Sequence, residues 1–265
     1  MSRPPLLQAL PENEPWPPVP PDAEFDALDV EMPELAVTAN CMIYRTKGQP
    51  SKVFKFGGGF REYQLQKAAG NCAIPVCGKV IGKPKAGNGD LYFYGFIMDL
   101  ATPIATPGAV LPSQCRSIMH QMIRIVERLH TKRIIHGDMK LDNMLLDNQG
   151  LVRLCDFGEG RYIDEDERIW NGASTMHFES PNRFQRAERS ERDPPPPTVE
   201  DDLYGLGLSI WQLHTGKIPH GDVAGDDLEL KERQRKGQTV DVTAVQDLEA
   251  REMITNLLRR GGARI

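Results

Sequence analysis

Short apolar runs separated by turn-forming residues fill the chain up to about residue 100. These runs are ELAVTANCMIYR (34–45), SKVFKF (51–56), VCGKVIGK (76–83) and LYFYGFIMDL (91–100). They are rich in β-branched and aromatic residues, which is typical of strands, and the segments TKGQP and PKAGNGD between them predict hairpin turns. The run FREYQLQKAA (60–69) instead has helical propensity and is followed by Gly70, a residue that ends helices. We therefore expect an antiparallel sheet with one helix.

Beyond Pro112 the apolar positions recur every three or four residues. The positions on this period are Ile118, Met119, Met122, Ile123, Val126 and Leu129. The spacing predicts an amphipathic helix, with Ser113 as the residue that caps its start. We expect two further helices over residues 203–214 and 245–258, and two short strands on either side of the turn DNQG (147–150).

The change of period predicts an α+β protein with two lobes. A small antiparallel β-sheet lobe with one helix is expected over residues 33–100, and a larger, mainly helical lobe over residues 101–265. Nine of the 21 prolines precede residue 34, so we expect residues 1–32 to form a disordered, Pro-rich arm. The stretch RAERSERDPPPPTVE (186–200) predicts an exposed Pro-rich insert. Such an insert is either a stiff loop or a polyproline ligand for a partner domain.

Composition and charge indicate which kinds of partner this chain is not expected to bind. Hydrophobic residues make up 40% and charged residues 26% of the chain, as in ordinary globular domains, and the net charge is −5. An acidic chain is not attracted to nucleic acid or to an anionic membrane, so we expect neither as a partner. No apolar run approaches the roughly 18 residues needed to span a bilayer. We therefore expect a cytoplasmic or nuclear protein, and favour a monomer.

Charged and polar residues crowd into HGDMKLDN (136–143), and the motif DFG follows at 156–158. Either this is a solvated charged turn, or the charges bind a charged ligand. Phosphoryl transfer needs a carboxylate for the attacking hydroxyl, a cation at the transferred group, and ligands for a metal ion that neutralises the phosphates. The residues that supply these groups at fixed spacing are Asp138, Lys140, Asn143 and Asp156. The pattern therefore favours phosphoryl transfer.

The two motifs together resemble the eukaryotic protein kinase family, whose catalytic loop has the form H-x-D-x-K-x-x-N. The resemblance implies a bilobal protein-kinase-like fold, ATP and Mg²⁺ as cofactors, and a protein hydroxyl as the substrate. It also implies that Asp138 is the catalytic carboxylate and that Lys140 steadies the γ-phosphate. Asn143 and Asp156 would then hold Mg²⁺. The segments TGKIPHGD and LLRRGGARI resemble in particular small kinase-like proteins of filamentous fungi.

Residues outside these two motifs also match the family. In STMHFESPN (174–182), Thr175 stands where Ser/Thr-directed kinases place a threonine that contacts the catalytic Asp and Lys. The resemblance implies structural roles for His136, Phe157, Asp202 and Arg264. His136 and Phe157 would stack beneath the site. Asp202, in DDLYGLG, would accept backbone N–H bonds from the catalytic loop, and Arg264 would anchor the segment that ends in Ser-Pro.

The small lobe is expected to supply an ion pair to the nucleotide site. Lys55 is the one cation at the end of SKVFKF, and Glu62 is the only acidic residue between Lys55 and residue 90. If the family's Lys–Glu pair exists, it is therefore Lys55–Glu62; otherwise these are two unrelated surface charges. The resemblance implies further ATP contacts from Met98, Asp99, Leu100 and Leu145.

The phosphate-covering loop departs from the family pattern. Gly48 is the only glycine between residues 34 and 55, so the motif G-x-G-x-x-G is missing. Ala36, Thr38 and Cys41 stand at the expected glycine positions. Because side chains limit how closely backbone N–H groups approach phosphate, we expect weakened nucleotide affinity.

Two further departures concern regulation and anchoring. Gly137 replaces the arginine that normally binds a phosphate on the activation segment, so we expect activity that phosphorylation there does not gate. The acidic segment YIDEDERIW (162–170) would already repel such a phosphate. Asn182 stands where the family has a glutamate that pairs with the late arginine, here Arg264, and Glu179 lies out of register for that role.

Three functions remain open at this point. The first is a Ser/Thr protein kinase that transfers the γ-phosphate of ATP to protein hydroxyls. The second is a pseudokinase that acts as a scaffold or binding module, favoured by the missing glycines. The third is a small-molecule phosphotransferase, a class that also uses HGD with an Asn five residues on. Lys140, Thr175 and DDLYGLG argue against the third.

Overall fold

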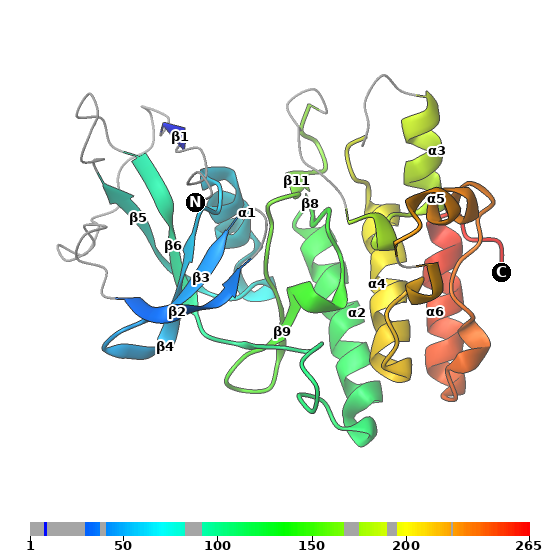
Figure 1. Ribbon diagram of the computed structural model, residues 1–265, viewed down its shortest axis with the longest axis horizontal. Coiled ribbons are helices and arrows are strands. Elements are labelled where there is room, and N and C mark those ends of the chain that lie inside the picture. Colours follow the sequence, from blue (N-terminus) through cyan, green and yellow to red (C-terminus); the bar gives the residue numbers. More distant parts are fainter. Residues whose placement is uncertain are drawn as a thin grey trace. The chain divides into compact units, whose positions relative to one another are not determined.

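The computed structural model describes residues 8–9, 30–37, 41–82, 92–166, 175–189, 195–223 and 225–265. The chain forms two compact units, Met1–Ala101 and Thr102–Ile265. The first unit is built around a β-sheet and the second mainly from helices (Figure 1). The predicted α+β class is therefore confirmed. Among the described residues, no helix has both the length and the apolar character needed to cross a membrane.

The first unit contains a six-stranded antiparallel sheet. Its strands are β1 (Gln8–Ala9), β2 (Val30–Val37), β3 (Met42–Thr46), β4 (Gln49–Phe56), β5 (Val76–Gly82) and β6 (Tyr92–Asp99). They run in the order β1-β6-β4-β3-β2, with β5 also paired to β6. The predicted β3–β4 and β5–β6 hairpins are both present. The turn PKAGNGD (84–90) lies outside the described residues.

The predicted arm 1–32 contributes to this sheet where it is described. Gln8 and Ala9 pair with Phe93 and Tyr92 of β6, and β2 begins at Val30. Because β4 pairs with β6 only from Gly95 onward, the first residues of β6 remain open to β1 on that side. A wholly disordered arm is therefore the wrong description for these residues. The rest of the arm lies outside the described part of the chain.

One helix, α1 (Phe60–Ala69), packs against β5 and β6. It ends as predicted at Gly70, whose φ of 57° is accessible to glycine at little cost. Aromatic rings fill the space between helix and sheet: Phe60 stacks on Tyr63, and both rings contact Phe93. Burial of these rings is a large source of stability for a unit of this size.

Within its described residues, the second unit consists of five helices and several short strands. The helices are α2 (Cys115–Thr131), α3 (Pro181–Arg189), α4 (Val199–Thr215), α5 (Asp227–Arg235) and α6 (Leu248–Arg260). The strands are β7 (Thr102–Pro103), β8 (Ile134–Ile135), β9 (Met144–Leu146), β10 (Val152–Leu154) and β11 (Arg161–Tyr162). They form a three-stranded sheet, β10-β9-β7, and a two-stranded one, β11-β8.

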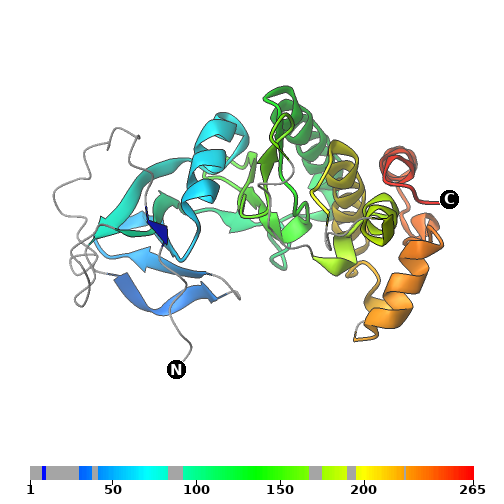
Figure 2. The ribbon, with the colours of Figure 1, turned by 90° about the horizontal axis from the view of Figure 1, so that it is seen from above.

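Helix α4 is the centre of this unit. It lies between α2 and α6 (Figures 1 and 2), and its residues from Asp201 to Trp211 are buried. A Cβ on Gly205 would lie 2.3 Å from the carbonyl oxygen of Met139, so only glycine allows α4 to approach the segment after β8 this closely. The buried helix therefore fixes the position of the segment that carries HGDMKLDN.

Helix starts are where the sequence predictions need correction. Ser113 does not cap α2, because a 3-10 turn over Pro112–Gln114 precedes the helix and Gln114 occupies the cap position. The helix predicted at 203–214 begins earlier, at Val199, because Thr198 and Asp201 form a capping box. The helix predicted at 245–258 begins at Leu248, where Asp247 caps it.

The Pro-rich insert also needs correction. Residues 186–189 form the last turn of α3, and Pro195, Pro196 and Pro197 are buried rather than exposed. Residues 190–194 lie outside the described part of the chain. Buried prolines are not available to an external partner domain, so the prediction of a polyproline ligand is wrong for this stretch.

Candidate active site

Four polar side chains of the second unit converge at the loop between β8 and β9. The Asp138 carboxylate accepts a hydrogen bond from Thr175 Oγ1 at 2.6 Å and lies 2.6 Å from the Lys140 ammonium. Lys140 also donates to Thr175 Oγ1 at 3.0 Å. Asn143 Nδ2 donates to the Asp138 carbonyl at 2.8 Å and to its carboxylate at 3.1 Å. One carboxylate thus has three donors of different chemistry fixed around it.

His136 supports this carboxylate from below. Its Nδ1 accepts the Asp138 N–H at 3.3 Å, and its Nε2 lies 2.8 Å from the Cys155 carbonyl oxygen. Because an N–H only donates and a carbonyl only accepts, these contacts require the neutral tautomer with the proton on Nε2. The ring packs on Phe157, which is fully buried, with centroids 4.8 Å apart. His136 therefore ties the two motifs together.

Asp202 holds the backbone of the same loop. It is almost completely buried at the start of α4, and its carboxylate accepts N–H bonds from His136 at 2.8 Å and Gly137 at 2.9 Å. Burial alone would raise the pKa of this carboxyl, but its interactions with His130 and His136 together outweigh burial and hold the pKa below its ordinary value. An ionised Asp202 is the form that accepts two backbone N–H bonds.

Gly137 adopts a left-handed backbone conformation, with a φ of +83°. A Cβ at this position would lie 2.2 Å from the carbonyl oxygen of Glu159 and 3.1 Å from Cγ of Pro197. Both the conformation and the space therefore require glycine here. Glycine at this position is a structural requirement of this chain.

Asp156 follows β10 and also has a positive φ, +63°. The backbone N–H of Cys155 donates to the Asn143 carbonyl at 3.0 Å, which joins the Asp156 segment to the loop that carries Asn143. Among the described residues, no cluster of three or more His, Cys, Asp or Glu is arranged to hold a metal. Mg²⁺ is usually held by one or two carboxylates together with substrate phosphates, so an Asp–Asn pair suits it.

The first unit holds the predicted ion pair. Lys55 of β4 and Glu62 in the first turn of α1 are in direct contact, and both side chains are buried. Lys55 lies between Ile43 of β3 and Phe96 of β6 in the sheet register. Burying this pair is costly unless the two charges stay together, so the sheet and α1 are held in one arrangement.

Comparison with protein-family models identifies the chain. The model of the protein kinase domain matches residues 91–261, well over half of the sequence.

The chain belongs to the protein kinase family.

The bilobal kinase fold predicted from the sequence is thereby confirmed, as is the resemblance that predicted it.

Similar proteins carry kinase names. The "Probable serine/threonine-protein kinase KIN1 homolog" of Enterocytozoon bieneusi is 25% identical over 162 residues, 61% of this chain and 26% of that protein. The serine/threonine-protein kinase PrkC of Bacillus subtilis is 26% identical over 139 residues, 52% and 20% of the two chains. The cGMP-dependent protein kinase of Toxoplasma gondii is 27% identical over 177 residues, 64% and 17%. The chain thus spans about a quarter or less of the length of these relatives.

The other residues predicted to contact ATP are divided between the two units. Met98 is buried on β6. The Asp99 carboxylate is paired with Lys52, and the Asp99 N–H donates to the Pro75 carbonyl at 3.1 Å. Leu100 donates its N–H to the Ser51 carbonyl at 2.8 Å. Leu145 is buried on β9 of the second unit.

Arg264 is not the anchor predicted from the family pattern. The Arg264 side chain is exposed and makes no hydrogen bond or ion pair with the part of the chain that the structure describes. Instead, Asn182 binds the loop after α6 directly, through Nδ2 to the Arg260 carbonyl at 3.1 Å and through its N–H to the Gly261 carbonyl at 3.0 Å. The Asn182 amide donates a hydrogen bond to a main-chain carbonyl, which the carboxylate of the family's glutamate could not do. With asparagine at this position, the chain does not need an arginine as its partner.

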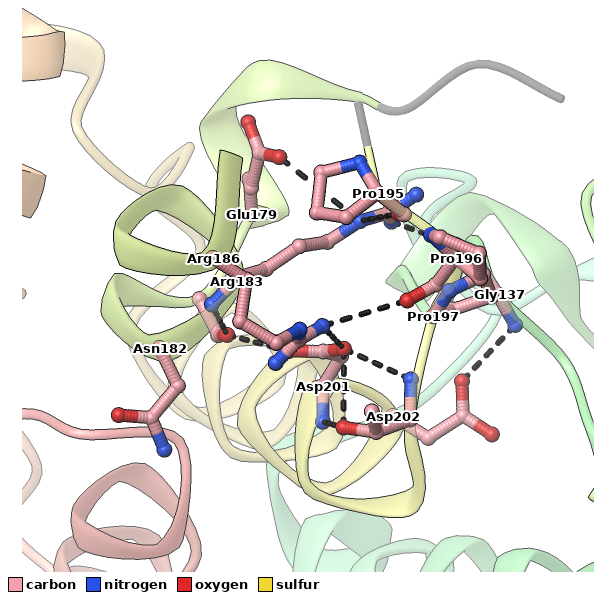
Figure 3. A network of polar contacts seen from close by, with 12 residues as sticks. Gly137, Glu179, Asn182, Arg183, Arg186, Pro195, Pro196, Pro197, Asp201 and Asp202 are labelled. Carbon is pink, nitrogen blue, oxygen red and sulfur yellow. Dashed lines mark hydrogen bonds and ion pairs between the residues drawn. The ribbon is translucent and has the colours of Figure 1, made fainter. Parts of the chain in front are cut away.

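Residue patterns did not reveal a group of buried and half-buried charges beside the kinase loop. Arg183 and Arg186 on α3 and Asp201 on α4 join the proline stretch to Gly137 (Figure 3). The sequence carried one signal: two arginines three residues apart lie on one side of a helix, shortly before a run of prolines that have carbonyls but no N–H groups.

Proposed function

We propose that the protein is a Ser/Thr protein kinase that transfers the γ-phosphate of ATP to hydroxyl groups of proteins. The observation that carries this proposal is the contact group of Asp138, Lys140, Asn143 and Thr175 around a single carboxylate. A solvated charged turn would not leave this side chain only 10% exposed with three donors fixed on its carboxylate.

Each residue of the group suits one task in phosphoryl transfer. Asp138 accepts the hydrogen bond of the attacking hydroxyl and orients it. Lys140 places a positive charge beside the oxygens of the transferred group, over which negative charge is spread. When bound, Mg²⁺ and ATP supply the phosphoryl group and neutralise the phosphate charge. Asn143 and Asp156 would hold the metal, since Asn143 directs its Nδ2 to Asp138 and leaves its amide oxygen for a cation.

Thr175 supports a preference for Ser and Thr hydroxyls. Its Oγ1 donates to Asp138 and accepts from Lys140, so it links the carboxylate and the cation from the segment that faces the substrate. Aminoglycoside-type phosphotransferases do not use this contact, which makes a small-molecule acceptor the weaker proposal.

A pseudokinase remains the second candidate because of one feature of the first unit. The positions expected to carry phosphate-loop glycines are Ala36, which is exposed on β2, and Cys41, which is buried; Thr38 lies outside the described residues. Side chains here weaken backbone contact with phosphate. Nucleotide binding without transfer is the outcome that this candidate predicts.

One assay separates these functions. Purified protein is incubated with Mg²⁺ and γ-labelled ATP alone, with generic protein substrates, and with small hydroxylated acceptors. Label on Ser or Thr that disappears in Asp156→Ala supports the kinase. No transfer to any acceptor supports the pseudokinase, and transfer to small acceptors alone supports the phosphotransferase.

A further inference from the structure

Three consecutive buried prolines, Pro195–Pro197, stand directly before Thr198, the cap of α4, and we call them the proline strap. Buried carbonyls need hydrogen-bond donors, and none of these three residues has a backbone N–H to offer the others. Each carbonyl receives one from a different arginine: Arg183 Nε to Pro195 at 3.0 Å, Arg186 Nη2 to Pro196 at 3.3 Å, and Arg161 Nη1 to Pro197 at 3.3 Å. The strap is therefore an internal binding partner for three cations.

Arg183 is the most deeply buried of these cations, with 2% of its surface exposed. Burial lowers the pKa of its guanidinium, while the nearby Asp201 and Glu179 carboxylates oppose that shift. Glu179 lies 3.8 Å away, and Asp201 is itself bound by Arg186 at 2.6 Å. Burying a charge costs solvation free energy, and this cost is offset only where several partners surround the charge.

The strap and Arg183 meet the catalytic loop at Gly137, one residue before Asp138. Arg183 Nη1 points at the Gly137 carbonyl oxygen at 3.4 Å, a long hydrogen bond whose attraction is mainly that of a charge for a dipole (Figure 3). Pro197 packs against the α-carbon side of Gly137, where a Cβ would lie 3.1 Å from its Cγ. Arg161 lies on β11, which pairs with β8 immediately before the loop.

We propose that Arg183 and the proline strap position the catalytic loop without any phosphate on the activation segment. Arg183 is a positioning residue: it acts on Gly137 and, through the backbone, on Asp138. In this arrangement the cation that supports the loop comes from α3 instead of from position 137, and its counter-charges are Asp201 and Glu179. The inference rests on the proposed kinase function and explains how a chain with Gly137 keeps its loop ordered.

The test compares Arg183→Met with Arg183→Lys and with the control Arg233→Met. Arg233 is a partly exposed arginine of α5 that pairs with Asp222 at 2.6 Å, away from the strap and the catalytic loop. At a temperature well below unfolding, Arg183→Met should lower kcat about 10- to 100-fold while KM for ATP stays within about twofold. Lysine keeps the charge but not the fork that reaches both carbonyls, so Arg183→Lys should recover only part of kcat. The control should match the wild type.

A second readout does not depend on transfer. Hydrogen exchange at the Gly137 amide, measured without nucleotide, should become faster in Arg183→Met, because that amide is held by Asp202 only while the loop keeps its shape. If Arg183→Met does not fold, the same exchange is measured in Arg186→Gln. This variant removes the half-exposed arginine that binds Pro196 and Asp201. A wild type without transfer would contradict the proposed function, while faster exchange would still support the strap.

Two results would overturn the strap. One is an Arg183→Met protein with lower thermal stability but unchanged kcat and unchanged exchange at Gly137, which is what a merely structural role predicts. The other is loss of wild-type activity after phosphatase treatment, because the loop would then depend on phosphate after all.

Discussion

At the scale of one residue, Gly137 explains why the catalytic loop of this protein has glycine where most protein kinases have arginine. The usual arginine at this position would need a left-handed backbone and would drive its Cβ into the Glu159 carbonyl. The conformation that Asp202 and the proline strap impose on the loop is therefore compatible with glycine alone.

We predict that Gly137→Ala destabilises the protein by clearly more than Gly150→Ala. Gly150 has a similar φ of +73° but no atom within 4 Å of a built Cβ, so its substitution has only the left-handed strain of about 1–2 kcal/mol. Gly137→Ala adds the clash with the Glu159 carbonyl. Urea unfolding of the two variants measures the difference, and equal losses would contradict the described loop geometry.

His220 leads to a prediction on pH. It is buried, and burial together with the Arg233 charge lowers its pKa from 6.5 to about 4. Between these two values the unfolded chain binds a proton that the folded protein does not. The stability contributed by neutral His220 is therefore complete above about pH 6.5 and is lost as the pH falls toward 4, on the order of 3 kcal/mol in all.

The matching variant is His220→Asn, since asparagine accepts the positive φ of 55° found at this position. Free energies of unfolding at pH 7, 6, 5 and 4.5 should fall more steeply for the wild type than for the variant. Parallel curves would show that His220 does not titrate in this window.

Single residues differ in how far sequence alone reveals them. Asp138, Asn143 and Asp156 lie in motifs whose members are close along the chain, so spacing alone placed them together. Arg183 could not be found this way, because its partner Gly137 is 46 residues away in the sequence and its role follows from burial. Burial of a charge depends on the whole fold.

At the scale of elements, the Lys55–Glu62 pair joins β4 to α1. Removing one partner would leave an uncompensated buried charge. We therefore expect Lys55→Met to lower the free energy of unfolding by about 3–5 kcal/mol. Lys55→Met combined with Glu62→Leu should recover most of that loss.

Lys52→Met is the matched control for this prediction. Lys52 lies on the same strand and is paired with Asp99, but both side chains are partly exposed, so its loss should amount to at most about 1 kcal/mol. Chemical denaturation of the four proteins measures the effects. A Lys55→Met protein as stable as Lys52→Met would mean that the pair does not couple strand and helix.

Elements with local signals were predictable and those set by packing were not. The segment TKGQP and the Gly70 stop lie next to the elements that they shape, so the β3–β4 hairpin and α1 were predicted correctly. The run predicted over residues 34–45 is instead two strands, β2 and β3, that pair with each other. The start of α4 was missed because its capping box follows directly after prolines that were expected to be exposed. The strap is buried only because the arginines of other elements surround it.

For the whole molecule, the switch from short β-rich runs to helical periods predicted the two units and their order. The structure divides the chain into a unit built around a β-sheet, Met1–Ala101, and a mainly helical unit, Thr102–Ile265. The identity of the acceptor could not be predicted, because the residues that hold ATP and the catalytic carboxylate are shared across the family whereas acceptor choice depends on surfaces that no motif describes.

The central claim is that Asp138 acts on the attacking hydroxyl, and its most direct test compares Asp138→Asn with Asp142→Asn. Asp142 lies in the same loop, is exposed, and loses the same charge on substitution. The quantity measured is the rate of transfer of label from γ-labelled ATP to a Ser/Thr protein substrate. We predict that Asp138→Asn lowers kcat about 10²- to 10⁴-fold while Asp142→Asn stays near the wild type. Equal rates for the two variants would contradict the assignment of Asp138 as the catalytic carboxylate.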